Sequence, residues 1–134
     1  MTRLFTCGVL LVACGVVAQA HHSIAGMYDA GRRVTVEGTV AQFHFVNPHP
    51  FVLLDVTDAG GKPRQWRLEM DNRRELVDIG VKEDTLRYGD RLVASGSPGR
   101  SEQRVMYAWK IERPADGLVY EQVGASPSIR IPSR

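Results

Sequence analysis

Residues 34–40, with the sequence VTVEGTV, carry the pattern that decides the fold class. Val34, Val36 and Val40 alternate with polar residues, and a period of two is typical of a strand that buries one face. Gly38 interrupts this apolar face, and a glycine inside a strand indicates a bulge or a bend. The pattern therefore predicts a mainly β protein that begins with a long strand bent at a glycine.

Four further strands are expected downstream. Residues 51–56 and 64–70 form two more strand patterns, and the turn-forming residues 58–61 separate them. After an interval with a different period, residues 91–95 and 104–112 predict a fourth and a fifth strand. The long first strand, bent at a glycine, supports a small barrel.

The interval between the third and fourth strands predicts a short helix near residues 72–79. Asp71 or Asn72 can cap it, and Glu75 stands three residues after Asn72, as in a capping box. Gly80 stands where helices often end in a left-handed glycine. We expect this helix to close one end of the barrel.

Three strands, a helix and two strands, in this order, indicate a five-stranded OB-like Greek-key barrel with one short helix between strands three and four. OB denotes the oligonucleotide/oligosaccharide-binding type of barrel. The period-two alternation also predicts which side chains form the core. These are Val34, Val36, Val40, Val52, Leu54, Trp66, Leu68, Leu76, Leu92 and Trp109.

Length and composition fit one domain. The chain has 134 residues, of which 24% are charged and 43% are hydrophobic, and this length leaves no room for two cores. We expect a signal peptide at 1–20, an extended N-terminal segment at 21–33, the barrel domain at 34–123 and a loose tail at 124–134. A short edge strand is expected at 118–123.

The first 20 residues predict export to the periplasm. Arg3 precedes an apolar stretch that ends in the small-x-small triplet AQA at residues 18–20, which is a cleavage signal. The stretch is too short to span a bilayer comfortably. Cleavage after Ala20 makes His21 the new N-terminus. The alternative is a lipoprotein signal, in which Cys14 is lipidated and becomes the first residue.

Charge and composition argue against several classes of protein. The formal net charge is +2, and loss of Arg3 with the leader leaves +1, which lacks the basic bias of nucleic-acid binders. Trp66 shares its predicted face with Leu68, so we expect it in the core and not in a base-stacking groove. Both cysteines, Cys7 and Cys14, lie in the leader, and no later stretch is long enough for a transmembrane segment.

The four histidines gather at two places, and together they suggest a copper site. His21 and His22 open the mature chain, and His44 and His49 flank the first hairpin. An N-terminal histidine offers its amine and its ring to one ion, and a nitrogen-rich site favours Cu(II) over Zn(II). We expect His21 to chelate the ion and His49 to add the third ligand. His44 is the reserve ligand, and His22 is the second choice at the terminus.

Ordinary structural roles remain open for the same histidines. His49 stands between two prolines and can fix its loop by a hydrogen bond, and His44 can be an ordinary strand residue. A metal site also needs the N-terminal segment to be held beside the hairpin, since a loose terminus loses entropy on closing. We expect packing of Tyr28 and Met27 on the barrel to hold it.

The sequence supports a catalytic site less strongly than it supports a metal site. Ser23 and His22 are neighbours on an extended segment, where adjacent side chains point apart. Asp55 and Glu69 lie on neighbouring predicted strands, but both positions read as solvent-facing. The sequence therefore favours a non-enzymatic binding module. The alternatives are an envelope protein-interaction module that docks through a barrel face or edge, and an enzyme with its metal at the N-terminal histidine.

Three motifs resemble those of a known family. They are HHS at residues 21–23, NPH at 47–49 and YGD at 88–90, and the first two are the specific ones. With the VEGTV strand, they resemble the exported bacterial family known as domain of unknown function 6152, over residues 21–113. The resemblance implies export to the periplasm and a small β-rich, OB-like domain, and it implies no reaction.

Overall fold

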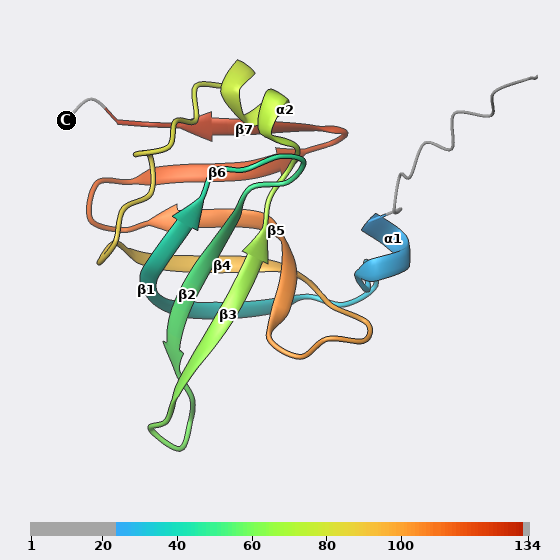
Figure 1. Cartoon of the computed structure of the whole chain (residues 1–134), viewed down its shortest axis with the longest axis vertical. Helices are drawn as coiled ribbons and strands as arrows, with labels where there is room; N and C mark the ends of the chain where they lie inside the picture. The colour runs from blue at the N-terminus through green and yellow to red at the C-terminus, as the bar shows by residue number, and fades with distance from the viewer. Residues whose placement is uncertain (1–23, 133–134) are drawn as a thin grey trace, which may run out of the picture.

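The structure is a computed structural model that describes residues 24–132, and it is mainly β (Figure 1). Five strands form a closed barrel: β1 (Val34–His44), β2 (Phe51–Thr57), β3 (Pro63–Glu69), β4 (Arg91–Pro98) and β5 (Val105–Arg113). The remaining elements are the helices α1 (Ile24–Met27) and α2 (Arg73–Asp78) and the strands β6 (Leu118–Val123) and β7 (Ser126–Arg130).

The strand pairing is that of an OB-type barrel, as the order of the elements predicts. The sheet order is β3-β2-β1-β4-β5-β6-β7, and a parallel pairing between β3 and β5 closes the ring. β1 pairs with β4 along its first half and with β2 along its second half. β5 likewise pairs with β3 at its start and with β6 at its end, so the β6–β7 hairpin extends the barrel wall.

The bend in β1 has two components. The register shift falls between Val40 and Gln42, which leaves Ala41 without a partner on β2. Gly38, where we expected the bulge or bend, serves a close backbone approach: a Cβ atom there would lie 2.3 Å from the carbonyl oxygen of Asp55. The glycine thus lets β1 cross β2 closely, and the bulge follows three residues later.

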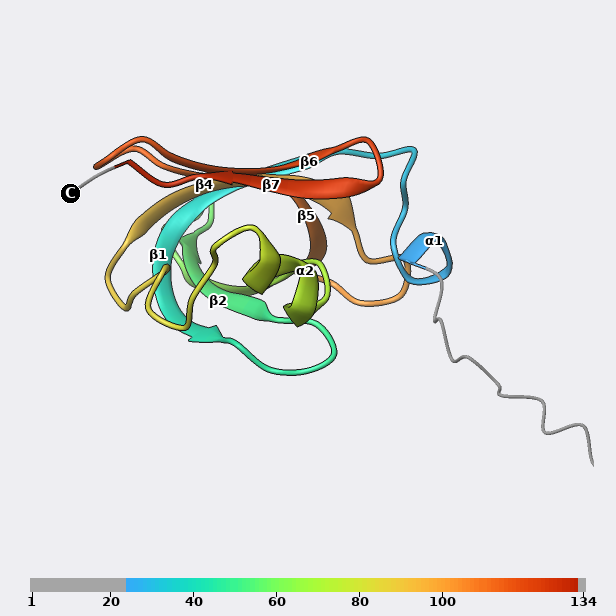
Figure 2. The same ribbon diagram turned by 90° about the horizontal axis from the view of Figure 1, so that it is seen from above.

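The helix between β3 and β4 is present and is capped as predicted. The Asn72 side chain accepts a hydrogen bond of 3.0 Å from the Glu75 amide, and Gly80 follows the helix with a φ of +95°. Leu76 is fully buried, and α2 lies over one end of the barrel (Figure 2). No helix within residues 24–132 is long and apolar enough to cross a membrane.

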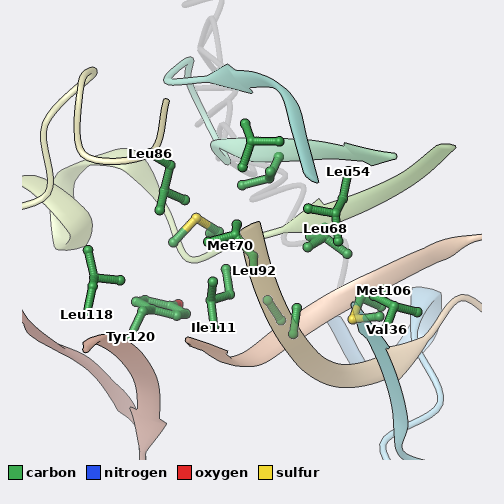
Figure 3. Close-up of a cluster of buried hydrophobic side chains, with 14 of the residues drawn as sticks. Val36, Leu54, Leu68, Met70, Leu86, Leu92, Met106, Ile111, Leu118 and Tyr120 are labelled. Carbon is green, nitrogen blue, oxygen red and sulfur yellow. The ribbon is translucent and has the colours of Figure 1, made fainter. Parts of the chain in front are cut away.

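The core fills the barrel and the space beneath α2 (Figure 3). Seven of the ten predicted core residues are buried in it: Val36, Val40, Val52, Leu54, Leu68, Leu76 and Leu92. Val34 and Trp66 are partly buried and pack against this cluster. The location of Trp66 on the core agrees with the role expected for it.

Trp109 is the exception, and its placement in the core was wrong. Ala108 and Lys110 pair with adjacent residues of β4, so Trp109 is an extra residue at a register shift. The shift reverses the alternation of β5, which places Ala108 in the core in place of Trp109. The indole donates a hydrogen bond of 2.8 Å to Ser97 Oγ, and the Arg33 guanidinium lies 4.1 Å from the ring centre.

Both segments outside the predicted barrel are more ordered than expected. The N-terminal segment contains the helical turn α1 and is not extended throughout. The expected loose tail forms β7 over residues 126–130, which pairs with β6. Ile129 stands opposite Tyr120 and packs against the core, and this apolar contact explains why the second strand of the hairpin forms.

Candidate functional site

His49 is held in one orientation by the barrel. It lies between β1 and β2, and its Nδ1 is 3.1 Å from the carbonyl oxygen of Met70. Since a carbonyl can only accept, Nδ1 carries the proton in this contact, and Nε2 keeps a lone pair. The backbone of Pro50 accepts from the Met70 amide at 2.9 Å, which ties the two segments together. The His49 side chain remains 32% exposed.

Glu69 is a buried carboxylate beside His49. It is 8% exposed, and its Oε2 accepts a hydrogen bond of 2.6 Å from the Tyr28 hydroxyl. Its Oε1 lies 3.8 Å from His49 Nδ1, and Arg67 Nη2 lies 3.9 Å from Oε2. The expectation that Glu69 faces solvent was therefore wrong, because the N-terminal segment supplies Tyr28 to cover it.

We call residues 24–33 the N-terminal arm, and two of its side chains dock on aromatic residues of β5. Tyr28 is 2% exposed, and its ring centre is 5.8 Å from that of Tyr107. Arg33 lies over Trp109. The Tyr107 and Trp109 rings contact each other edge to face at 6.2 Å. The arm thus covers a continuous aromatic ridge on the barrel.

Backbone hydrogen bonds reinforce this docking. The Asp29 amide donates to the carbonyl of Pro98, and the Arg100 amide donates to the carbonyl of Met27, each at 2.9 Å. The predicted packing of Tyr28 is confirmed by its burial. The packing predicted for the Met27 side chain is wrong, since it is 49% exposed and only its carbonyl contributes.

A second buried carboxylate lies two residues after Glu69. Asp71 is 8% exposed and accepts hydrogen bonds from the hydroxyls of Tyr107 and Tyr120, the latter at 2.7 Å. The Gln122 amide donates to the Tyr107 hydroxyl at 3.1 Å. Burial, followed by the Asp71 carboxylate, raises the pKa of both tyrosines well above the ordinary value of 10.

His44, the second predicted ligand in the described range, has different partners. Strand pairing places it opposite Phe51, and the two rings stack with centres 4.3 Å apart. Arg67 also lies over the Phe51 ring, with its guanidinium carbon 4.3 Å from the centre. The hairpin therefore pairs His44 with Phe51 and holds His49 through Met70, so the imidazoles have separate environments.

The remaining predicted groups are distributed as follows. His21, His22, Ser23 and the cleavage site lie outside the described residues. Within residues 24–132, no three His, Cys, Asp or Glu side chains are grouped so as to hold a metal ion. Asp55 is exposed, stands opposite Gln65 and accepts from its amide at 3.1 Å, whereas Glu69 stands opposite Phe51. Strand pairing thus separates the two carboxylates considered for acid–base work.

These features define a small OB-type barrel whose outer surface carries a docked N-terminal arm beside a fixed histidine. The chain belongs to DUF6152, a family of unknown function, whose pattern matches residues 9–107. It is also similar to the N-terminal domain of the PriB protein from Thermoanaerobacter tencongensis. That similarity has 18% identity and a TM-score of 0.38, and covers 77% of this chain and 99% of that one. No curated protein matches the chain.

Proposed function

We propose that this protein is an exported, non-enzymatic binding module for one Cu(II) ion. Its ligands are the amine and ring of His21, which cleavage after Ala20 makes N-terminal, and Nε2 of His49. The observation that carries the proposal is the contact between His49 Nδ1 and the Met70 carbonyl. Metal-binding histidines usually donate their other ring N–H to a carbonyl or carboxylate, which fixes the ring and its tautomer.

The docked arm supports the same proposal. Three residue steps lead from His21 to Ile24, where the arm begins, and three steps span at most about 10 Å. The arm in turn reaches Glu69 through Tyr28, and Glu69 lies beside His49. The nearby carboxylate favours a cation at this surface, and three nitrogen donors favour Cu(II) over Zn(II).

Copper titration of the processed protein tests the proposal. Intact mass first establishes that the exported protein begins at His21. One added residue before His21 separates the free amine from that ring, and His49→Ala removes the third ligand. We expect each change to weaken Cu(II) binding at least tenfold, about 1.4 kcal/mol, in a competition titration. His44→Ala is the matched control and should leave the affinity unchanged.

Two results would contradict the proposal. One is a mass that corresponds to a lipidated chain beginning at Cys14. The other is correctly cleaved protein that takes up no Cu(II), or whose uptake is indifferent to both changes at the proposed ligands. Loss of binding in His44→Ala but not in His49→Ala would assign the third ligand to the reserve residue.

The alternative function is an envelope protein-interaction module, and the edge strand β7 supports it. β7 is the last strand in the sheet order, so one of its edges has no strand partner within residues 24–132. Such an edge can add a strand from another protein. A protein that binds no Cu(II) but forms a complex lost when the backbone of residues 126–130 is blocked would favour this function.

A further inference from the structure

We infer that the edge of β7 that has no strand partner within residues 24–132 pairs with the same edge of a second copy of this chain. The inference goes beyond the proposed function, because the pairing involves neither a metal ion nor a histidine. β7 is the last strand of the sheet, and Figure 1 shows it at the margin of the sheet. The two strands run antiparallel about a two-fold axis, which gives a closed, symmetric dimer.

The hairpin turn determines which backbone groups of β7 point outward. Only two residues separate Val123 from Ser126, and Val123 and Ser126 are opposite each other in the ladder. The pair that closes a two-residue turn is hydrogen-bonded, and such pairs alternate with non-hydrogen-bonded pairs along the ladder. The pairs at Pro127 and Ile129 are therefore of the second kind, so their backbone groups point away from β6. Pro127 fits this position, because β6 does not need its missing N–H.

The outward groups favour one symmetric register. Ile129 offers both its N–H and its carbonyl, whereas Pro127 offers only a carbonyl. An axis at Ile129 joins that residue to its copy by two hydrogen bonds, and it sets the Pro127 carbonyl opposite the N–H of Ile131 of the second copy. An axis at Pro127 has no hydrogen bond at its centre. An axis at Ser128 sets each Pro127, which has no donor, against an Ile129 carbonyl.

Side chains on both faces of β7 favour the same register. Ile129 packs on the core, so an axis at Ile129 brings two apolar side chains together on the barrel side. On that side Ile131, which is 45% exposed, gains Pro127 as an apolar neighbour. On the outer side Ser128 lies opposite Arg130 of the second copy. An axis at Arg130 would set two arginines opposite each other, and like charges in that position destabilise a strand pair.

Charge complementarity supports a second copy as the occupant. Ser128 pairs with Glu121 of β6, and its small side chain leaves space above the strand. The hollow on this face is lined by Glu112 and Glu121, and Lys110 pairs with Glu112 at 2.9 Å. Glu121 is exposed and is therefore available to the long side chain of Arg130 of the second copy, which extends over Ser128. The two-fold axis makes this attraction occur twice.

Sedimentation equilibrium of the exported protein in EDTA tests the pairing without metal-dependent association. One short strand pair is smaller than a permanent interface, so we expect a reversible, concentration-dependent dimer. Arg130→Glu should raise the dissociation constant about tenfold or more, because it sets a carboxylate against Glu121. Adding Glu121→Arg to that variant should restore the dimer. Arg32→Glu is the matched control, since it makes the same charge change at an exposed residue of the arm, and it should have no effect.

A second pair of variants tests the backbone hydrogen bonds. Ile131→Pro removes the N–H that donates across the axis, whereas Ile131→Ala shortens the side chain and keeps the N–H. Residue 131 follows the last residue of β7, so neither change removes a hydrogen bond between strands of one chain. Two lost hydrogen bonds should make the Ile131→Pro dimer about tenfold or more weaker than the Ile131→Ala dimer. Isotope-filtered NOE spectra of mixed labelled and unlabelled chains should connect the Hα atoms of Ser128 and Arg130.

The outcomes separate this inference from the proposed function. A protein that stays monomeric at millimolar concentration overturns the inference even if it binds Cu(II), and a metal-free dimer supports it even if no Cu(II) binds. A dimer unchanged by both Arg130→Glu and Ile131→Pro also overturns it. A monomer that binds a strand of another protein at β7 assigns the edge to the alternative function and overturns the second copy. Circular dichroism checks the fold, and if Arg130→Glu unfolds, the two Ile131 variants decide.

Discussion

At the scale of single residues, two buried carboxylates near the pairing of β3 with β5 hold other segments of the chain through hydrogen bonds. Glu69 and Asp71 are each 8% exposed, and each accepts hydrogen bonds from tyrosine hydroxyls. A buried carboxylate is costly unless donors compensate for lost water. The tyrosines supply those donors, so each carboxylate specifies where a distant segment docks: Tyr28 for Glu69, and Tyr120 for Asp71.

Asp71→Asn is expected to destabilise the fold by about 2 kcal/mol. Hydrogen bonds to a charged group contribute roughly 1.5–3 kcal/mol, and the neutral amide is a weaker acceptor for Tyr107 and Tyr120. Urea denaturation measures the change as a lower midpoint with an unchanged slope. Asp55→Asn is the matched control, since that carboxylate is exposed and has the Gln65 amide as partner. Equal effects of the two substitutions would contradict the role assigned to Asp71.

At the scale of elements, glycines allow the strands to cross at the distances that barrel closure requires. A Cβ atom on Gly38 would lie 2.3 Å from the Asp55 carbonyl, and one on Gly96 would lie 2.1 Å from the Tyr107 carbonyl. Both contacts are with backbone, which cannot move aside as a side chain can. A register shift accompanies each glycine, at Ala41 on β1 and at Trp109 on β5.

Gly38→Ala should therefore destabilise the barrel by at least 1–3 kcal/mol, roughly the cost of overpacking a close-packed site. Thermal unfolding followed by circular dichroism measures the loss. Gly31→Ala is the control, because its Cβ would meet only a side-chain oxygen of Asp29 at 3.5 Å, an ordinary contact. A Gly38→Ala variant as stable as Gly31→Ala would show that β1 and β2 do not approach so closely.

At the scale of the whole molecule, buried tyrosines connect the arm, the barrel and the β6–β7 hairpin. Tyr28, Tyr107 and Tyr120 are all at most 5% exposed. Burial first, and the neighbouring carboxylates second, raise the pKa of each above 10. The folded state thus keeps these phenols protonated at a pH where the unfolded chain ionises them.

Stability should decline in alkali for this reason. Below pH 10 the three phenols are neutral in both states, and their contribution is complete. Above pH 10 only the unfolded state loses protons, so the free energy of unfolding falls by about 1.4 kcal/mol per pH unit for each phenol. Urea titrations between pH 9 and pH 11 measure how steeply the free energy of unfolding falls with pH. This range brackets the tyrosine pKa of about 10 in the unfolded chain. Tyr120→Phe should have a shallower slope, and an equal slope would refute the assignment.

Much of the fold could be predicted, since its signals are local. The alternation of residues 34–40, the cap at Asn72 and the glycine after α2 each specify an element within a few residues. The sequence did not predict β7, because the proline and serines of the tail are typical of a loose segment. The contact of Ile129 with the core, which no local pattern indicates, stabilises the strand. For the candidate site, the sequence indicated only which histidines could take part. Its buried carboxylate Glu69 could not be recognised, since alternation alone marks it as exposed.

By itself, the sequence determined the class of barrel, its helix and most of its core, because a period of two and a capping box are properties of neighbouring residues. Tertiary structure alone decided that Trp109 faces away from the core, because a one-residue shift against β4 reverses every later side chain. It also decided that Glu69 is buried, because the covering hydroxyl comes from Tyr28, 41 residues earlier in the chain. No local pattern encodes a contact between segments that only barrel closure brings together.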